Sequence, residues 1–339
     1  MTRTFEAKPA KREKTPLLVG LIGPSGTGKT YSALRLAAGF QRVTGGETFV
    51  IDTEARRALH YADKFKFQHV PFGAPFNPAS YLDAINYCVS KGATTVIVDS
   101  MSHEHEGPGG ILEMHQAAVD KMSGGDYKKA KAVSMLAWAK PKAERRRLIN
   151  SIMQIANCNF IFCWRAKEKL KIVKGGDPEP LGFLPIAGEE FVYEMTLKCL
   201  LLPGANGSPT WQSEMPGEKL MMKLPEQFRQ TFNRPQQLDE NVGETLVRWA
   251  EGSVKTSDEP LPSLGELMAS YEACSDPATW RALEAMRGKA WSSISGADKT
   301  RLKRCSDESN KRIEQANEQS EPPIDDDDIP MTDENGDIE

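Results

Sequence analysis

The sequence lacks any apolar run that approaches the ~18 consecutive residues needed to cross a bilayer. Residues 1–14 are polar and basic, and they contain no apolar segment of the kind found in signal peptides. Hydrophobic residues make up 39% and charged residues 27% of the 339 positions, which excludes a fibrous or wholly disordered chain. We therefore expect a globular protein of the cytoplasm with no membrane partner.

Cysteine and histidine are too scattered to suggest a metal or disulfide framework. The six cysteines form no C-x-x-C pair and four of them lie in apolar stretches, so we expect buried thiols in a reducing compartment. His103 and His105 are two residues apart, but no third ligand is evident, so this pair does not predict a metal site.

Charge is unevenly distributed along the chain, whose net charge is −4. Residues 321–339 hold nine acidic and no basic residues, so the remaining chain carries a net charge of +5. A basic body with an acidic tail is common in proteins that bind nucleic acid. The tail is either a solubility segment or an autoinhibitory polyanion that occupies the chain's own basic channel, and we favour the second reading.

Composition divides the chain into five segments. They are a basic lead-in (1–15), an α/β domain (16–252), a linker (253–262), a helical accessory domain (263–316) and a disordered acidic tail (317–339). In the second segment, strand-length apolar runs at 17–22, 48–52, 94–98, 160–164 and 195–202 alternate with amphipathic stretches. Asn77 and Pro78 predict the start of one intervening helix, and Gly92 its end. This alternation predicts an α/β fold with a mostly parallel central sheet.

A glycine-rich stretch follows the first predicted strand and matches the pattern G-x-x-x-x-G-K-[ST]. Its residues are Gly23, Pro24, Ser25, Gly26, Thr27, Gly28, Lys29 and Thr30. Glycines let consecutive backbone N–H groups turn toward a phosphate, and the helix predicted next (31–40) adds its N-terminal dipole. We expect Lys29 to contact the β- and γ-phosphates and Thr30 to ligate Mg²⁺. The sequence therefore predicts a P-loop that binds ATP with Mg²⁺.

Two carboxylates follow later strands of the same predicted sheet. Asp99 ends the strand at 94–98, where a P-loop protein holds Mg²⁺. Glu54 lies just past the strand at 48–52. Because the carboxyl ends of parallel strands meet at the ligand crevice, we expect Glu54 to orient the water that attacks the γ-phosphate.

The order and spacing of these segments resemble the RecA family of recombination ATPases. The segments are GPSGTGKT, FVIDTEARRALHYADKF, TTVIVDS and NFIFCWRAKEKL, and they lie between residues 17 and 202. The chain is most similar to the short RecA-like ATPases of phages and prophages that accompany single-strand annealing. This resemblance implies a RecA-like P-loop NTPase fold, a role in phage-type homologous recombination and a bacterial host cell.

The resemblance also implies roles for three side chains. A glutamate at the position of Glu54 is the family's catalytic base. An aromatic residue at the position of Tyr61 packs on adenine. A polar residue at the position of Arg165 senses the γ-phosphate and signals to a DNA-binding loop; RecA itself has glutamine there.

The resemblance implies that the loop at 167–188, which begins with a cationic stretch and continues into a flexible turn, holds single-stranded DNA. A second loop, at 103–110, follows the strand that ends at Asp99 and is expected near the same channel. A helical region before the strand predicted at 160–164 contains Lys140, Lys142 and the run Arg145, Arg146 and Arg147. For the three arginines, a solvated helix face and a DNA contact are equally compatible with the sequence.

Assembly and partners follow from the same resemblance. One P-loop per chain without a convincing arginine finger favours a homo-oligomer with sites completed between subunits, where Lys219 and Lys223 are candidates to act on a neighbour's γ-phosphate. The Asp-rich end resembles the acidic tip of bacterial single-stranded-DNA-binding proteins, so such a protein or an annealing protein is a possible partner.

These observations predict a Mg²⁺-dependent ATPase coupled to single-stranded DNA binding and to annealing or strand exchange. Two other classes remain open. A replicative helicase or helicase loader would share the core and would unwind a forked duplex. A nucleotide-gated scaffold would bind ATP to recruit partners and hydrolyse it negligibly. A metabolic kinase is disfavoured, because no acceptor-site motif or lid is visible.

Overall fold

The computed structural model describes residues 7, 9, 13–174, 176–252, 264–291 and 295–318. Contacts between residues divide the chain into two compact units, Met1–Val254 and Lys255–Glu339. The linker expected at 253–262 lies outside the described residues, as do most of the lead-in expected at 1–15 and most of the acidic tail expected at 317–339.

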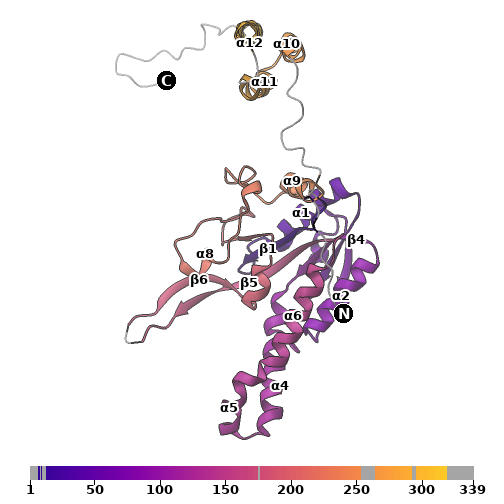
Figure 1. Ribbon diagram of the computed structural model, residues 1–339, viewed down its shortest axis with the longest axis vertical. Coiled ribbons are helices and arrows are strands. Elements are labelled where there is room, and N and C mark those ends of the chain that lie inside the picture. The colour runs from indigo at the N-terminus through magenta and orange to yellow at the C-terminus, as the bar shows by residue number, and fades with distance from the viewer. Residues whose placement is uncertain are drawn as a thin grey trace, which may run out of the picture. The chain divides into compact units, whose positions relative to one another are not determined.

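A seven-stranded sheet forms the centre of the first unit (Figure 1). Its strands are β1 (Leu18–Gly23), β2 (Glu47–Asp52), β3 (Gln68–Pro71), β4 (Ala93–Asp99), β5 (Asn159–Lys171), β6 (Glu179–Pro185) and β7 (Leu197–Leu200). The order across the sheet is β3-β2-β4-β5-β1-β7, with all neighbours parallel, and β6 pairs antiparallel with β5. The predicted α/β fold with a mostly parallel sheet is confirmed.

Helices cover both faces of this sheet, so its strands are buried on both sides (Figure 1). The covering helices are α1 (Lys29–Thr44) and α9 (Glu240–Ala250) on one face and α2 (Pro78–Ser90) and α6 (Ala139–Met153) on the other. Along β5, Phe160, Phe162 and Trp164 enter the core beneath α2 and α6, whereas Ile161 and Cys163 enter the core beneath α1 and α9. This alternation is the two-residue period of a strand.

Helix α1 crosses α9 at two glycines. A Cβ atom on Gly39 would lie 2.1 Å from the carbonyl oxygen of Glu240, and one on Gly243 would lie 2.3 Å from that of Leu36. Only glycine permits such close approach of the two backbones. The helix that follows the P-loop is therefore fixed by a segment about 200 residues further along the chain.

Smaller helices connect these elements. They are η1 (Arg57–Tyr61), α3 (Ser102–Glu106), α4 (Ile111–Ser123), α5 (Tyr127–Ala137), α7 (Glu189–Tyr193), α8 (Pro216–Lys219) and η2 (Glu226–Phe228). Asn77 accepts a hydrogen bond from the backbone N–H of Ser80 (2.9 Å) and begins α2 as predicted. All six cysteines are buried and free, which confirms the expectation of buried thiols.

Two parts of the first unit extend away from the sheet (Figure 1). Helices α4 and α5 lie side by side and are followed by α6, which returns to the sheet. The second extension is the hairpin of β5 and β6, in which Lys167 pairs with Leu184 and Lys171 with Glu179.

The structure corrects two expectations about the polar segments. The segment at 167–188 is not a flexible turn throughout, because β5 continues to Lys171 and pairs with β6. The segment at 103–110 begins within helix α3 rather than as a loop.

The second unit contains three described helices, α10 (Leu264–Ala273), α11 (Pro277–Ala290) and α12 (Gly296–Glu318). They share a small core that includes Leu267, Tyr271, Leu283, Leu302 and Ile313. The predicted helical C-terminal region is therefore present. Among the described residues of the whole chain, no helix combines the length and the apolar character needed to cross a membrane.

Candidate active site

The P-loop connects β1 to α1. Gly26 and Gly28 have φ angles of 81° and 88°, a left-handed backbone that favours glycine, and Gly28 is the N-cap of α1. The buried ammonium of Lys29 donates to the carbonyl oxygens of Gly23 (2.9 Å) and Pro24 (2.6 Å). Burial lowers the pKa of Lys29, while the nearby acidic side chains act in the opposite direction. The loop thus holds a cation and a helix N-terminus at one point.

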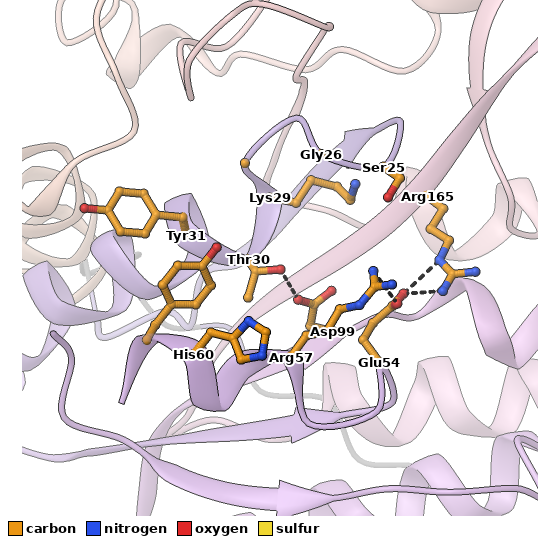
Figure 2. A pocket seen from close by; sticks show the side chains of 12 residues that line it. Ser25, Gly26, Lys29, Thr30, Tyr31, Glu54, Arg57, His60, Asp99 and Arg165 are labelled. Carbon is orange, nitrogen blue, oxygen red and sulfur yellow. Dashed lines mark hydrogen bonds and ion pairs between the residues drawn. The ribbon is translucent and has the colours of Figure 1, made fainter. Parts of the chain in front are cut away.

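Thr30 and Asp99 come together beside Lys29 (Figure 2). The hydroxyl of Thr30 donates to Oδ2 of Asp99 over 2.5 Å. Asp99 ends β4 and is 4% exposed, and its burial raises the pKa of its carboxyl to about 6, although the hydrogen bond from Thr30 opposes the shift. The two side chains that the sequence predicts as Mg²⁺ ligands therefore lie within hydrogen-bonding distance of each other.

A turn after β2 directs Glu54 into the same region. The carboxylate of Asp52 accepts the backbone N–H of Glu54 (2.8 Å) and that of Ala58 (3.0 Å). Between them, Ala55 and Arg56 have φ angles of 55° and 67°, which are uncommon for residues other than glycine. Asp52 thus holds a strained turn that begins at Glu54.

Glu54 is ion-paired with two arginines (Figure 2). Oε1 of Glu54 accepts from Nε of Arg165 at 2.8 Å and lies 2.6 Å from Nη2, and Oε2 lies 3.4 Å from Nη1 of Arg57. Burial alone would raise the pKa of Glu54, but the hydrogen bond and charge of Arg165, with His103 and Arg57, lower it overall. The carboxylate is therefore ionised and held by cations.

A hydrogen-bonded layer lies behind this pair. The hydroxyl of Thr53 lies 2.7 Å from Nδ1 of His103 and donates to the carbonyl of Ser100 (3.1 Å). The ring of His103 stacks on Phe76. Burial and the charge of Arg165 lower the pKa of His103, so the ring is mainly neutral at pH 7. This layer joins the end of β2 to the segment that follows β4.

These residues surround a cavity of about 330 Å³ (Figure 2). Its lining comprises Ser25, Gly26, Gly28, Lys29, Thr30, Tyr31, Glu54, Arg57, His60, Tyr61, Asp99 and Arg165. Three predicted P-loop residues lie outside this lining. Gly23 and Pro24 instead accept from Lys29, and Thr27 donates to the carbonyl of Pro24 (2.9 Å).

A second cavity of about 260 Å³ also borders the P-loop. Its lining comprises Gly26, Thr27, Gly28, Tyr31, Ser32, Arg35, Gly204, Asn206, Gly207, Gln237 and Leu238. The two cavities share Tyr31, whose ring lies 5.4 Å from the ring of Tyr61. The predicted adenine contact, Tyr61, is therefore part of an aromatic pair beside the phosphate loop.

A family model of the AAA domain matches residues 15–196, which is more than half of the chain. The chain belongs to the AAA-domain family. A comparison with curated proteins found no match. As an AAA-domain protein the chain is a nucleotide-dependent P-loop ATPase. Since such enzymes hold their nucleotide at the P-loop, the cavity beside Lys29 is the candidate active site of this AAA domain.

Three residues of the AAA domain's cavity were not predicted from the sequence: Tyr31, Arg57 and His60. Arg57 follows Glu54 by three residues, and this short spacing is the one signal that pointed to their ion pair. Tyr31 follows Thr30 directly, so its place at the start of α1 had a sequence signal too.

Other predicted residues lie elsewhere in the AAA-domain chain. Arg145 is neither solvated nor free for DNA, because it is buried and binds both carboxylate oxygens of Glu104 (2.8 and 3.0 Å). His105 contacts Arg145 (3.0 Å) and burial lowers its pKa to about 4. Lys219 forms an exposed pair with Glu214 (3.8 Å), and Lys223 donates to the carbonyl of Met195 (2.8 Å).

Proposed function

We propose that the chain is a Mg²⁺-dependent ATPase whose turnover is coupled to single-stranded DNA binding. In this proposal it is a RecA-like enzyme of the phage recombination type, which acts in annealing or strand exchange as a homo-oligomer. A single-stranded-DNA-binding protein or an annealing protein is its expected partner. The AAA-domain family accounts for nucleotide use, and the cationic hairpin of β5 and β6 supports the DNA part.

The donor set beside Lys29 fits Mg²⁺. Thr30 and Asp99 offer a hydroxyl and a carboxylate within 2.5 Å of each other, and hard oxygen ligands with waters and phosphate oxygens are what Mg²⁺ prefers. When bound there, Mg²⁺ would neutralise charge that develops on the β- and γ-phosphates. Backbone N–H groups of the P-loop and the ammonium of Lys29 would bind the same phosphates.

Glu54 is the candidate for water activation. Its carboxylate is ionised and can accept a proton from a water that attacks the γ-phosphate. Both of its oxygens are engaged by arginines in this structure. A turnover-competent arrangement therefore needs Arg165 to exchange part of its contact with Glu54 for the γ-phosphate, which suits a bidentate guanidinium.

One observation supports the DNA part of the proposal. Strand β5 contains both Arg165, the ion-pair partner of Glu54, and the start of the cationic hairpin. Lys167, Lys169 and Lys171 alternate along β5 beyond Arg165 and are exposed. The pairs that Lys167 and Lys171 form, at 3.9 Å with Glu106 and 3.1 Å with Glu179, are solvent-exposed and cost little to break. A phosphate backbone on these lysines would thus act on the strand that carries Arg165.

The test is ATP turnover with and without single-stranded DNA. For wild type we expect stimulation by DNA, whereas Glu54→Gln should lose roughly 10²-fold or more of the turnover while still binding nucleotide. The triple change Lys167, Lys169 and Lys171→Gln should retain unstimulated turnover and lose the stimulation. The matched control changes three lysines of α12, Lys299, Lys303 and Lys311, to Gln and should respond to DNA as wild type does.

Three results would contradict the proposal at different points. Turnover that neither needs Glu54 nor responds to single-stranded DNA would leave only the family assignment. Tight nucleotide binding with negligible turnover under all conditions would favour the nucleotide-gated scaffold, which the double ion pair of Glu54 also suits. Unwinding of a forked duplex would favour a helicase.

A further inference from the structure

Helices α4 and α5, with the start of α6, form an extension of the first unit away from its sheet (Figure 1). The ring of His115 on α4 stacks on Trp138 with centroids 4.0 Å apart, and its Nε2 lies 2.9 Å from the carbonyl oxygen of Ser134. These contacts fix α5 against α4. The extension is therefore a defined shape and not a loose insertion.

The exposed surface of α5 and α6 is strongly basic. Its exposed cations are Lys128, Lys129 and Lys131 on α5 and Lys140, Lys142, Arg146 and Arg147 on α6. Between residues 127 and 153 the sequence has one acidic residue, Glu144, which lies 3.7 Å from Lys140. Asp126, the residue before α5, is occupied as its N-cap. No carboxylate among the described residues pairs with the three lysines of α5.

Apolar side chains are exposed among these lysines. Tyr127 and Met135 are 84% exposed and Leu136 is 64% exposed, whereas Ala137 is the one residue of α5 that is buried. A helix that leaves most of its side chains in solvent gains little from packing. An exposed basic face of this kind suits a partner that carries negative charge.

We propose that the α5–α6 surface, Lys128–Arg147, is a second nucleic-acid site that binds duplex DNA through its phosphate backbone. The site goes beyond the proposed function, because it is separate from the hairpin of β5 and β6. Its cations lie along two successive helices, and a helix such as α5 fits the major groove of B-form DNA. Tyr127 is the one aromatic residue on α5, so successive bases of a single strand would find little to stack on.

Buried contacts connect this surface to the nucleotide pocket. Arg145 of α6 binds Glu104 of α3 through two hydrogen bonds, and both side chains are buried. Helix α3 begins three residues after Asp99, and its His103 contacts Thr53, the neighbour of Glu54. Duplex bound on α5 and α6 would therefore be held rigidly relative to the ends of β2 and β4.

The test uses the full chain with Lys128, Lys129 and Lys131→Gln and a labelled duplex of about two helical turns. Binding is followed by fluorescence anisotropy across a salt series. Each lost phosphate contact lowers the slope of log K against log salt by about 0.9, so we expect a slope smaller by about 2.7 and at least roughly tenfold weaker binding at low salt. The hairpin variant (Lys167, Lys169 and Lys171→Gln) and the α12 variant should keep the wild-type slope for duplex.

The proposal would be overturned if wild type binds no duplex, or if the α5 variant keeps the wild-type slope. It would also be overturned if the α12 variant loses as much affinity, because the effect would then be one of net charge. Loss of self-association in sedimentation, with unchanged duplex binding, would instead make this face an interface between copies. Single-strand binding is measured on the same variants, and its absence in wild type would contradict the proposed function without affecting this result.

Discussion

Among the side chains around Glu54, Arg165 contributes most to lowering the pKa of the candidate base. Arg165 is about one third exposed, yet Nε and Nη2 both lie within 2.8 Å of Oε1 of Glu54. Because an ionised carboxylate is needed to accept a proton, the pKa of Glu54 affects turnover at acidic pH, as does that of Asp99, which burial raises to about 6.

Arg165→Gln tests that relation. Removing the cation leaves burial of Glu54 as the main influence, so the pKa of its carboxyl rises above the wild-type value. We expect the acidic limb of the pH profile of turnover to move to higher pH, with turnover at neutral pH roughly 10²-fold lower through lost contact with the γ-phosphate. Arg57→Gln is the control, since its partner lies at 3.4 Å and its side chain is 65% exposed, and it should move the limb less. An unmoved limb in Arg165→Gln would show that the arginine does not set the charge of Glu54.

Lys198 is a buried lysine that lies outside the candidate active site. Lys198 of β7 is 3% exposed, donates to the carbonyl of Leu220 (2.9 Å) and lies over the ring of Tyr193. Burial, with the charge of Lys223, lowers its pKa to about 8. Between pH 8 and about 10.4, the unfolded chain thus binds a proton that the folded chain has released.

The sign of the resulting effect on stability follows from that difference. The contribution of Lys198 to the free energy of unfolding rises with pH from about 8 upward, because the unfolded state binds more protons. Lys198→Met should remove this rise, so that stability measured by urea unfolding at pH 7.5, 8.5 and 9.5 becomes flatter than in wild type. Lys142→Met, at an exposed position of the same unit, should keep the wild-type dependence. An identical dependence in Lys198→Met and wild type would contradict the assignment.

At this scale the sequence predicted the residues whose spacing follows from backbone geometry. Lys29 and Thr30 are fixed by the P-loop pattern, and Asp99 and Glu54 by their place after apolar strands. Arg145 could not be predicted, because its burial depends on Glu104, 41 positions away, and a run of three arginines does not reveal which one turns inward.

Among the elements, the crossing of α1 and α9 gives the sharpest prediction. In an isolated helix, replacing glycine with alanine stabilises the helix by about 1 kcal/mol. At Gly243 the new Cβ would lie 2.3 Å from a backbone oxygen of α1, so we expect Gly243→Ala to destabilise the first unit by about 1–3 kcal/mol. Urea unfolding measures the free energy of unfolding of the first unit. The transition of that unit is recognised because added nucleotide shifts its midpoint.

A matched control for this change exists in the second unit. A Cβ atom on Gly288 of α11 would meet no neighbouring atom within 4 Å, so Gly288→Ala should stabilise that unit or leave it unchanged. Destabilisation by both substitutions, or by neither, would contradict the close crossing.

The helices and strands also show the limit of what a local sequence pattern can predict. Asn77 and Pro78 predicted the start of α2 because a cap is a local signal. Strand β5 is longer than the run predicted at 160–164, because residues 167–171 are charged except for Leu170, have no buried face, and form a strand by pairing with β6. Such pairing depends on residues beyond the turn, which a local pattern does not contain.

In the whole molecule, every residue that lines the two cavities beside the P-loop lies before residue 239. Helix α9, which packs against α1, ends at Ala250. A chain that ends at Gly252 should therefore bind nucleotide within about twofold of the full chain, as measured by titration with a fluorescent analogue. A chain that ends at residue 239 would expose the apolar face of α1 and should not yield folded protein. Loss of binding on truncation at 252 would show that the second unit contributes to the site.

The glycine crossing also bears on how the protein is made. Strands β1, β2 and β4 leave the ribosome long before α9, which is separated from α1 by about 200 residues. At roughly 5–20 residues per second, the apolar side of α1 stays uncovered for about 10–40 s of synthesis. During that interval the nascent chain is a natural client for a chaperone, and slow codons between β5 and α9 would lengthen its exposure.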